Sequence, residues 1–92
     1  MQTDRAMIIA LQSLNWLIAN DDLRDVFLGS SGLSPDDLKS SAGDPHLLGS
    51  VLDFILMDDQ WVIACCDAQS IPYEDLQQAR FSLPGGEQVH WT

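Results

Sequence analysis

Two stretches of the chain carry the same pattern. Residues 14–38 read LNWLIANDDLRDVFLGSSGLSPDDL, and residues 52–76 read LDFILMDDQWVIACCDAQSIPYEDL. When the first stretch is moved forward by 38 positions, the apolar and acidic positions coincide, as in Leu14/Leu52, Trp16/Phe54, Leu17/Ile55, Asp21/Asp59, Leu33/Ile71, Asp37/Asp75 and Leu38/Leu76. A period of this length indicates one supersecondary unit used twice, each copy covering an apolar face that the other cannot bury alone. The repeat predicts an architecture and no chemistry.

Apolar residues within each unit recur at helical spacing, and no segment predicts a strand. We expect helices over about residues 3–19, from 20–22 to about 31, from 35 to about 43, from 45 to 56, from 58–59 to about 69, and from about 72 to 83. The fold class is therefore all-α, a compact bundle of about six short helices built from two helix–corner–helix repeats of period 38. Residues 1–92 form a single helical domain, with repeat one at about 3–43, repeat two at about 44–83 and a flexible tail at 84–92. The copies pack about a pseudo-twofold axis or stack side by side, and the sequence leaves both arrangements open.

The corner between the second and third helices has the strongest local pattern. Gly32 suits the left-handed position that ends a helix, which would bring Leu28 and Leu33 together in a Schellman motif. Ser34 is a good N-cap, and a proline at the first helical position follows it. Leu33 and Leu38 stand at the N′ and N4 positions of a hydrophobic staple, which would fix the start of the next helix. The predicted structural corner consists of Gly32, Leu33, Ser34, Pro35, Asp37 and Leu38.

These pieces, together with their order, resemble a known family. The segments ALQSLNWLIAND, FLGSSGLSPDDL, DPHLLGSVLDFILMDD and the closing LPGG are similar to a family of small alphaproteobacterial proteins catalogued as domain of unknown function 3572. The resemblance covers nearly the whole chain. It implies a bacterial cytoplasmic protein, and it implies no activity, cofactor or catalytic residue.

Charge and composition narrow the possible partners. The 92 residues hold 14 acids and four bases, for a formal net charge of −10. Twelve of the acids are Asp, and most fall where helices begin, which indicates capping. The chain has no basic stripe, so nucleic-acid binding is disfavoured. It has no apolar run long enough for a bilayer, and the opening MQTDR is unlike a secretory signal. We expect a cytoplasmic protein that binds neither nucleic acid nor membrane.

The reactive side chains do not form a recognisable catalytic or metal site. The only histidines are His46 and His90, and the only cysteines are the adjacent Cys65 and Cys66. Adjacent cysteines lack the CxxC spacing that lets two thiolates bind one zinc ion, and they rarely pair with each other. The paired aspartates do not follow a calcium-loop pattern. We expect free, buried thiols, no cofactor, no metal and no enzymatic activity.

The first predicted helix carries a candidate interaction surface. Its core stripe is predicted to consist of Ala6, Met7, Ala10, Leu11, Leu14, Leu17 and Ile18. Ile9 and Trp16 fall on the opposite side, beside Arg5 and Gln12. Three alternatives could bury these apolar side chains: another helix of the chain, the tail folding back through Val89 and Trp91, or a partner molecule. The candidate interaction surface is Arg5, Ile9, Gln12, Trp16, Val89 and Trp91, and Trp61 is expected in the core.

Three functions remain after these exclusions. The leading one is a non-enzymatic protein-interaction module whose partner is another protein or a second copy of the chain, because aromatic side chains at exposed positions are favoured interface anchors. The second is an acidic mimic or sequestering partner of a basic protein, recognised by its salt dependence. The third is a small-molecule binder or enzyme that uses a cleft between the repeats.

Overall fold

A computed structural model describes residues 1–83, so the predicted tail, with Val89 and Trp91, lies outside the described residues. The described part folds entirely into helices and short connections, without a strand. The helices are α1 (Thr3–Ala19), α2 (Asp21–Ser31), α3 (Pro35–Ser40), α4 (Pro45–Leu56), α5 (Asp59–Gln69) and α6 (Tyr73–Phe81). The all-α prediction is confirmed. Helices α2 and α5 begin 38 residues apart and also end 38 residues apart.

Short polar side chains fix where most of these helices begin. The Asp44 carboxylate accepts a hydrogen bond from the His46 amide and the Asp58 carboxylate from the Gln60 amide, both at 2.9 Å. Asn20 caps α2 in the same manner. The acids predicted to lie at helix starts do so, where they complement the partial positive charge of a helix N-terminus: Asp21, Asp22, Asp36, Asp37, Asp44, Asp58, Asp59 and Asp75.

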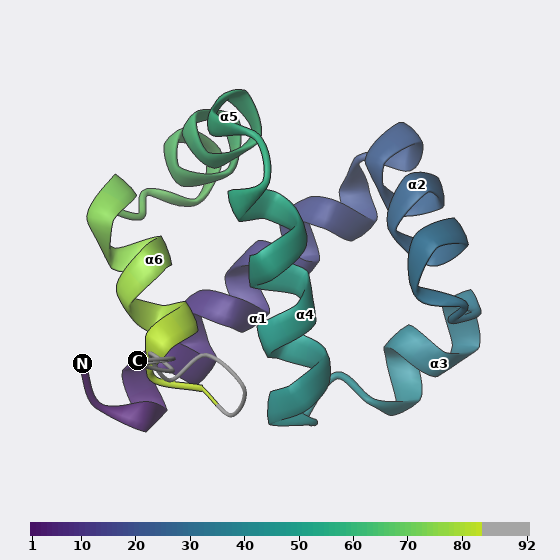
Figure 1. Cartoon of the computed structure of the whole chain (residues 1–92), viewed down its shortest axis with the longest axis horizontal. Coiled ribbons are helices and arrows are strands. Elements are labelled where there is room, and N and C mark those ends of the chain that lie inside the picture. Colours follow the sequence, from purple (N-terminus) through teal and green to yellow (C-terminus); the bar gives the residue numbers. More distant parts are fainter. Residues whose placement is uncertain (84–92) are drawn as a thin grey trace, which may run out of the picture.

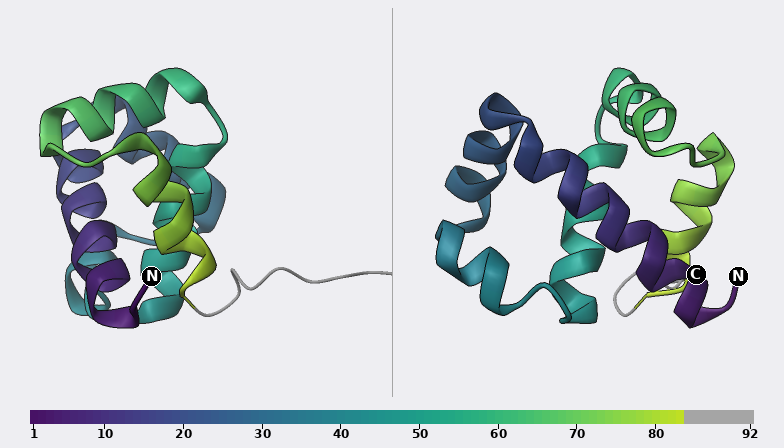
Figure 2. Two further views of the ribbon diagram at one scale, coloured as in Figure 1. Left: turned by 90° about the vertical axis from the view of Figure 1, so that its left-hand side faces the viewer. Right: turned by 180° about the vertical axis from the view of Figure 1, so that it is seen from behind.

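Helices α1 and α4 cross at the centre of the molecule (Figure 1). Helices α2 and α3 form one side, and α5 and α6 form the other. The reverse view shows α1 running diagonally between the two sides (Figure 2). Helix α1 contacts α2, α4, α5 and α6, and α4–α6 also contact one another. None of the described helices is long and apolar enough to cross a membrane.

The core lies between the crossing helices and is completed by aromatic rings. Phe27 of α2 meets Phe54 of α4 edge to face at a centroid distance of 5.4 Å, and Phe54 stacks on Trp61 of α5 at 4.9 Å. Trp61 therefore packs against the core, as predicted. Arg80 of α6, only 9% exposed, donates to Asp53 of α4 through both Nε and Nη2, the latter at 2.8 Å. This ion pair joins α6 to α4.

The predicted face of α1 is wrong in part. Ile9, expected opposite the core, is fully buried, whereas Leu11, expected in the core stripe, is 37% exposed. The buried residues of α1 are Ala6, Ile9, Ala10, Ser13, Leu14 and Leu17. Ser13 lies near the middle of this face, and its hydroxyl donates to the Ile9 carbonyl at 2.8 Å. The apolar pattern assigns serine to the surface. Because Ser13 lies at the centre of the buried face, the predicted stripe was placed to one side of that face.

The predicted corner has the expected geometry with one difference. Gly32 is left-handed at φ 76°, and Ser34 and Asp37 form a reciprocal capping box with bonds of 3.2 and 3.0 Å. However, the Gly32 amide donates to the Leu28 carbonyl, and the Leu33 amide donates to Ser31 Oγ. This is the αL motif rather than the predicted Schellman motif. The Ser31 hydroxyl accepts the hydrogen bond of the Leu33 amide, which in a Schellman motif would be donated to the Leu28 carbonyl.

Candidate functional site

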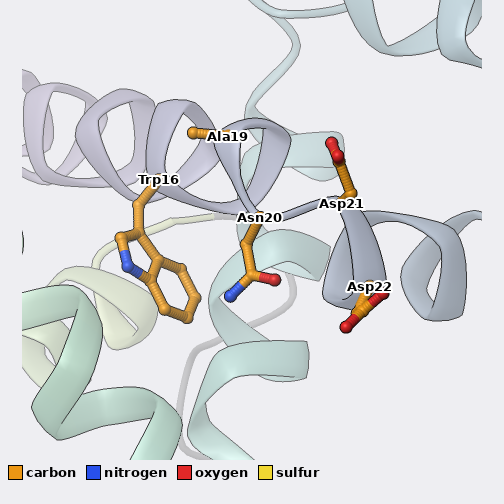
Figure 3. Close-up of a pocket in the computed structure, with 5 residues that line it drawn as sticks. All are labelled: Trp16, Ala19, Asn20, Asp21 and Asp22. Carbon is orange, nitrogen blue, oxygen red and sulfur yellow. The ribbon is translucent and has the colours of Figure 1, made fainter.

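Trp16 lies near the end of α1, half-buried, and packs its inner side against the core. Its outer side lines an open pocket of about 460 Å³, together with Ala19, Asn20, Asp21 and Asp22. Trp16 and Asn20 project from the same side of the helix end, whereas Ala19 and Asp21 lie on the other (Figure 3). The junction of α1 and α2 thus places an indole beside the acidic first turn of α2.

The charge around Trp16 is negative. Asp21 is 80% exposed and pairs with Arg24 at 3.1 Å, while Asp22 is exposed and has no ion pair among the described residues. The Asn20 side-chain oxygen accepts a hydrogen bond from the Leu23 backbone amide, and this bond holds the Asn20 side chain on the same side of the helix end as the indole. An indole and a carboxylate that line the same open pocket suit a cationic group, through cation–π and Coulomb attraction. The arrangement can therefore hold an ammonium or guanidinium group, and it contains no nucleophile.

The structure separates the other members of the candidate interaction surface. Ile9 is buried by helices of the same chain, so it belongs to the core and to no surface. Arg5 is exposed, and its guanidinium lies 3.6 Å from the Asp75 carboxylate of α6. Gln12 is half-buried. The tail members lie outside the described residues. Among the predicted residues, Trp16 is the aromatic side chain that the structure shows at the surface.

Helix α1 also has an exposed apolar strip that was not predicted. Ile8 is 52% and Leu11 is 37% exposed. They follow Asp4 and precede Asn15 at steps of three and four, so the four side chains share one outward face. An apolar pair between two polar residues on one face was the sequence pattern that could have identified them. Large exposed apolar side chains also occur on other helices, among them Val26, Ile63, Tyr73 and Phe81.

The cysteine thiols are free and buried, as predicted. Burial raises the pKa of the Cys66 thiol to about 11, and the neighbouring Cys65 adds to the increase. Burial also raises the pKa of Cys65, partly opposed by hydrogen bonding with the Ser13 side chain. At neutral pH both groups are therefore protonated, and a protonated thiol is a poor nucleophile and a poor metal ligand.

Within residues 1–83, the remaining polar groups do not gather into a catalytic centre. Tyr73 donates to the Asp67 carboxylate at 2.7 Å, which raises the pKa of the Tyr73 hydroxyl. His46 is exposed in the first turn of α4, and His90 lies outside the described residues. Among residues 1–83, no group of three or more His, Cys, Asp or Glu side chains is placed to hold a metal ion.

A second pocket of about 440 Å³ lies where α1, α2 and α3 meet. Ile18, Pro35 and Leu38 form its apolar lining, and the charged side chains of Arg24, Asp25 and Lys39 complete it. It belongs to the first half of the chain, and not to a cleft between the two halves.

The comparisons identify a family and no function. The profile of the family described as "Protein of unknown function (DUF3572)" matches residues 3–86, which is nearly the whole chain. No curated protein and no solved structure matches the sequence.

Proposed function

Because the chain belongs to the DUF3572 family of proteins of unknown function, we propose its function from geometry alone: it is a non-enzymatic protein-interaction module. One observation carries the proposal, namely the half-exposed Trp16 on an open pocket with an acidic rim. Tryptophan is enriched among the residues that dominate interface energetics. A globular protein that leaves such a side chain accessible at a concave site is suited to bind a partner there.

The partner at this site is a protein that presents a lysine or arginine side chain. Asp22 has no ion pair among the described residues, and the formal net charge of the chain is −10, so a basic surface would be attracted and oriented. The indole supplies the apolar contact and the carboxylate supplies the charge. We place this interaction in the bacterial cytoplasm, which is the compartment that free thiols favour.

A pull-down from the native cytoplasm with the intact chain and with Trp16→Ser tests the proposal. We expect the serine variant to lose the partner while it stays monomeric and folded, with a melting temperature lowered only moderately by the loss of the inner contact of Trp16 with the core. Met57→Ser is the matched control, because Met57 is an exposed apolar side chain, 77% exposed, in another part of the molecule. If Trp16→Ser loses stability as a monomer and the partner still binds the folded fraction, Trp16 is a core residue and the proposal fails.

The second candidate is an acidic protein that sequesters a basic one through charge alone. The observation that favours it is the set of exposed carboxylates at the helix starts, such as Asp22, Asp36 and Asp59. Binding through exposed charges weakens strongly with ionic strength, because the Debye length falls from about 10 Å at 0.1 M salt to about 3 Å at 1 M. A complex that survives 0.5 M salt and is lost in Trp16→Ser favours the module. A complex with the opposite behaviour favours the acidic mimic.

A further inference from the structure

The pocket between α1, α2 and α3 opens at the surface and borders the core. Its lining includes Leu38, which is only 2% exposed and belongs to the core. Ile18 of α1 and Pro35 of α3 form the apolar walls. Its volume of about 440 Å³ lies within the range of small-molecule sites, which are mostly apolar with a few placed polar groups.

The two basic side chains at this pocket differ in their ion pairs. The Arg24 guanidinium donates to the Ile18 carbonyl at 3.4 Å and pairs with Asp21 and Asp25 at 3.1 and 3.5 Å. The Arg24 guanidinium is therefore occupied by partners within the chain, and its positive charge offsets the negative charge of Asp25 at the edge of the same pocket. Lys39 is different. All four basic side chains of the chain are described, and Lys39 is the one without an ion pair among residues 1–83.

The position of Lys39 determines the kind of ligand. Its ammonium group ends a flexible side chain in the last turn of α3, beside an apolar lining. An anion with an apolar body would place the body against Ile18, Pro35 and Leu38 and its charge at Lys39. A cation would meet the exposed ammonium, and a neutral molecule would gain the apolar contact alone.

We propose that this pocket binds a small amphiphilic carboxylate, a straight-chain carboxylic acid of medium length, with its carboxylate on Lys39 Nζ. The ligand would contact three helices at once, and α3 otherwise has few contacts with the rest of the molecule. Because a ligand stabilises the state that binds it, occupancy would slow hydrogen exchange in α3. This site is separate from the Trp16 pocket and needs no protein partner, so it goes beyond the proposed function.

Titration of the isotope-labelled full chain with hexanoate, hexanol and hexylammonium tests the site by NMR. The three probes share an alkyl chain and differ in charge. We expect saturable shifts at Ile18, Leu38 and Lys39 with hexanoate, at dissociation constants on the order of millimolar. Hexanol should bind more weakly and hexylammonium more weakly still, although the chain is acidic and would attract the amine elsewhere.

Two charge-matched variants locate the carboxylate. Lys39→Gln should weaken hexanoate roughly two- to five-fold, which is the effect of one exposed ion pair, and should leave hexanol unchanged. Arg5→Gln removes the same charge at a distant position and should weaken neither. The proposal is overturned if hexanoate causes no saturable shift at the pocket, if hexylammonium binds as well as hexanoate, or if the two variants weaken hexanoate equally.

Discussion

The corner at Gly32 and the corner at Ser70 both turn at a left-handed residue but have different supports. Gly32 has φ 76° and Ser70 has φ 57°, both left-handed, 38 residues apart. After Gly32 the chain is held by local hydrogen bonds, in the capping box of Ser34 and Asp37. After Ser70 the Ile71 amide donates to the Cys66 carbonyl at 2.9 Å, and the next helix has no side-chain cap, while the Ile71 side chain is buried at 6% exposed. Side-chain capping therefore supports the first corner, and a backbone hydrogen bond together with tertiary packing supports the second.

The helices that follow the two corners show the same difference. Helix α6 packs on α1, α4 and α5, and it is further joined to α4 by Arg80 and to α1 by Asp75. Helix α3 buries one side chain, Leu38. A helix with few buried contacts opens at lower free energy than one packed on three sides. The α2–α3 side should therefore exchange amide hydrogens faster than the α5–α6 side.

The largest expected effect comes from the packed corner. Ile71→Ala should lower the free energy of unfolding by about 2–5 kcal/mol, because it leaves a cavity at a buried position. Leu33→Ala, at the position 38 residues earlier, should cost less than about 1 kcal/mol, since Leu33 is half-exposed. Urea unfolding of both variants measures the difference. Equal losses would show that packing supports both corners alike.

Gly32→Val should cost more than about 1 kcal/mol. No heavy atom lies within 4 Å of the position a Cβ would occupy, so the cost comes from the left-handed backbone and not from a clash. Gly29→Val is the matched control, because Gly29 is helical and equally open; it should change stability by at most about 0.5 kcal/mol. Thermal unfolding compares the two, and similar melting temperatures would contradict the role of the φ angle.

Ser34→Ala should cost about 1 kcal/mol by removing the cap of α3. The same variant combined with Asp37→Ala should lose less than the sum of the single losses, because the two side chains bond to each other's backbone. A double-mutant cycle in urea measures the coupling. Strictly additive losses would mean that the capping box does not act as a unit.

Acid should weaken the Gly32 corner. The backbone and side-chain bonds of Ser34 lower the pKa of Asp37 below its usual 3.8. A lowered pKa in the folded state gives stability that is present above about pH 4 and is lost as pH falls through the folded-state value. Asp37→Asn should therefore flatten the acid limb of the stability–pH curve. Amide exchange in α3 between pH 5 and pH 2 reports the change; an unaltered limb would contradict it.

The smallest expected effect is none. Chelators and reductants should leave the melting temperature unchanged, since the thiols are free and buried. A drop of more than about 5 °C corresponds to roughly 1 kcal/mol for a domain of this size. Such a drop with a chelator would reveal a bound metal ion, and with a reductant a disulfide.

Helix starts could be predicted from sequence because their causes are local, whereas α3, expected to reach about residue 43, ends at Ser40. Ser34-Pro35 and Asp44-Pro45 carry the cap and the first-turn proline within two residues, and both helices begin as expected. The inward face of α1 could not be predicted in the same way. Four helices contact α1, so burial depends on residues far away in sequence. The buried Ser13 then shifted the apparent face, and with it the placement of Ile9.

The candidate site was also predictable only in part. Trp16 was identifiable because the helical spacing placed this large aromatic residue opposite the predicted core stripe, although the same argument misplaced Ile9. The Ile18–Leu38–Lys39 pocket was not, because it forms only when α3 folds back beside α1, and no spacing within one helix encodes that approach. Pockets made by several elements are properties of the packed chain.

The contact of Phe27 with Phe54, and of Phe54 with Trp61, provides an optical reporter of tertiary structure. Phe27 is the one fully buried side chain of α2, so separation of α2 from the core must break the edge-to-face contact and alter the environment of the ring stacked on Trp61. Near-ultraviolet circular dichroism responds to such fixed aromatic packing, while far-ultraviolet signals report helix content. Loss of the former with retention of the latter would record detachment of the α2–α3 side before its helices unfold.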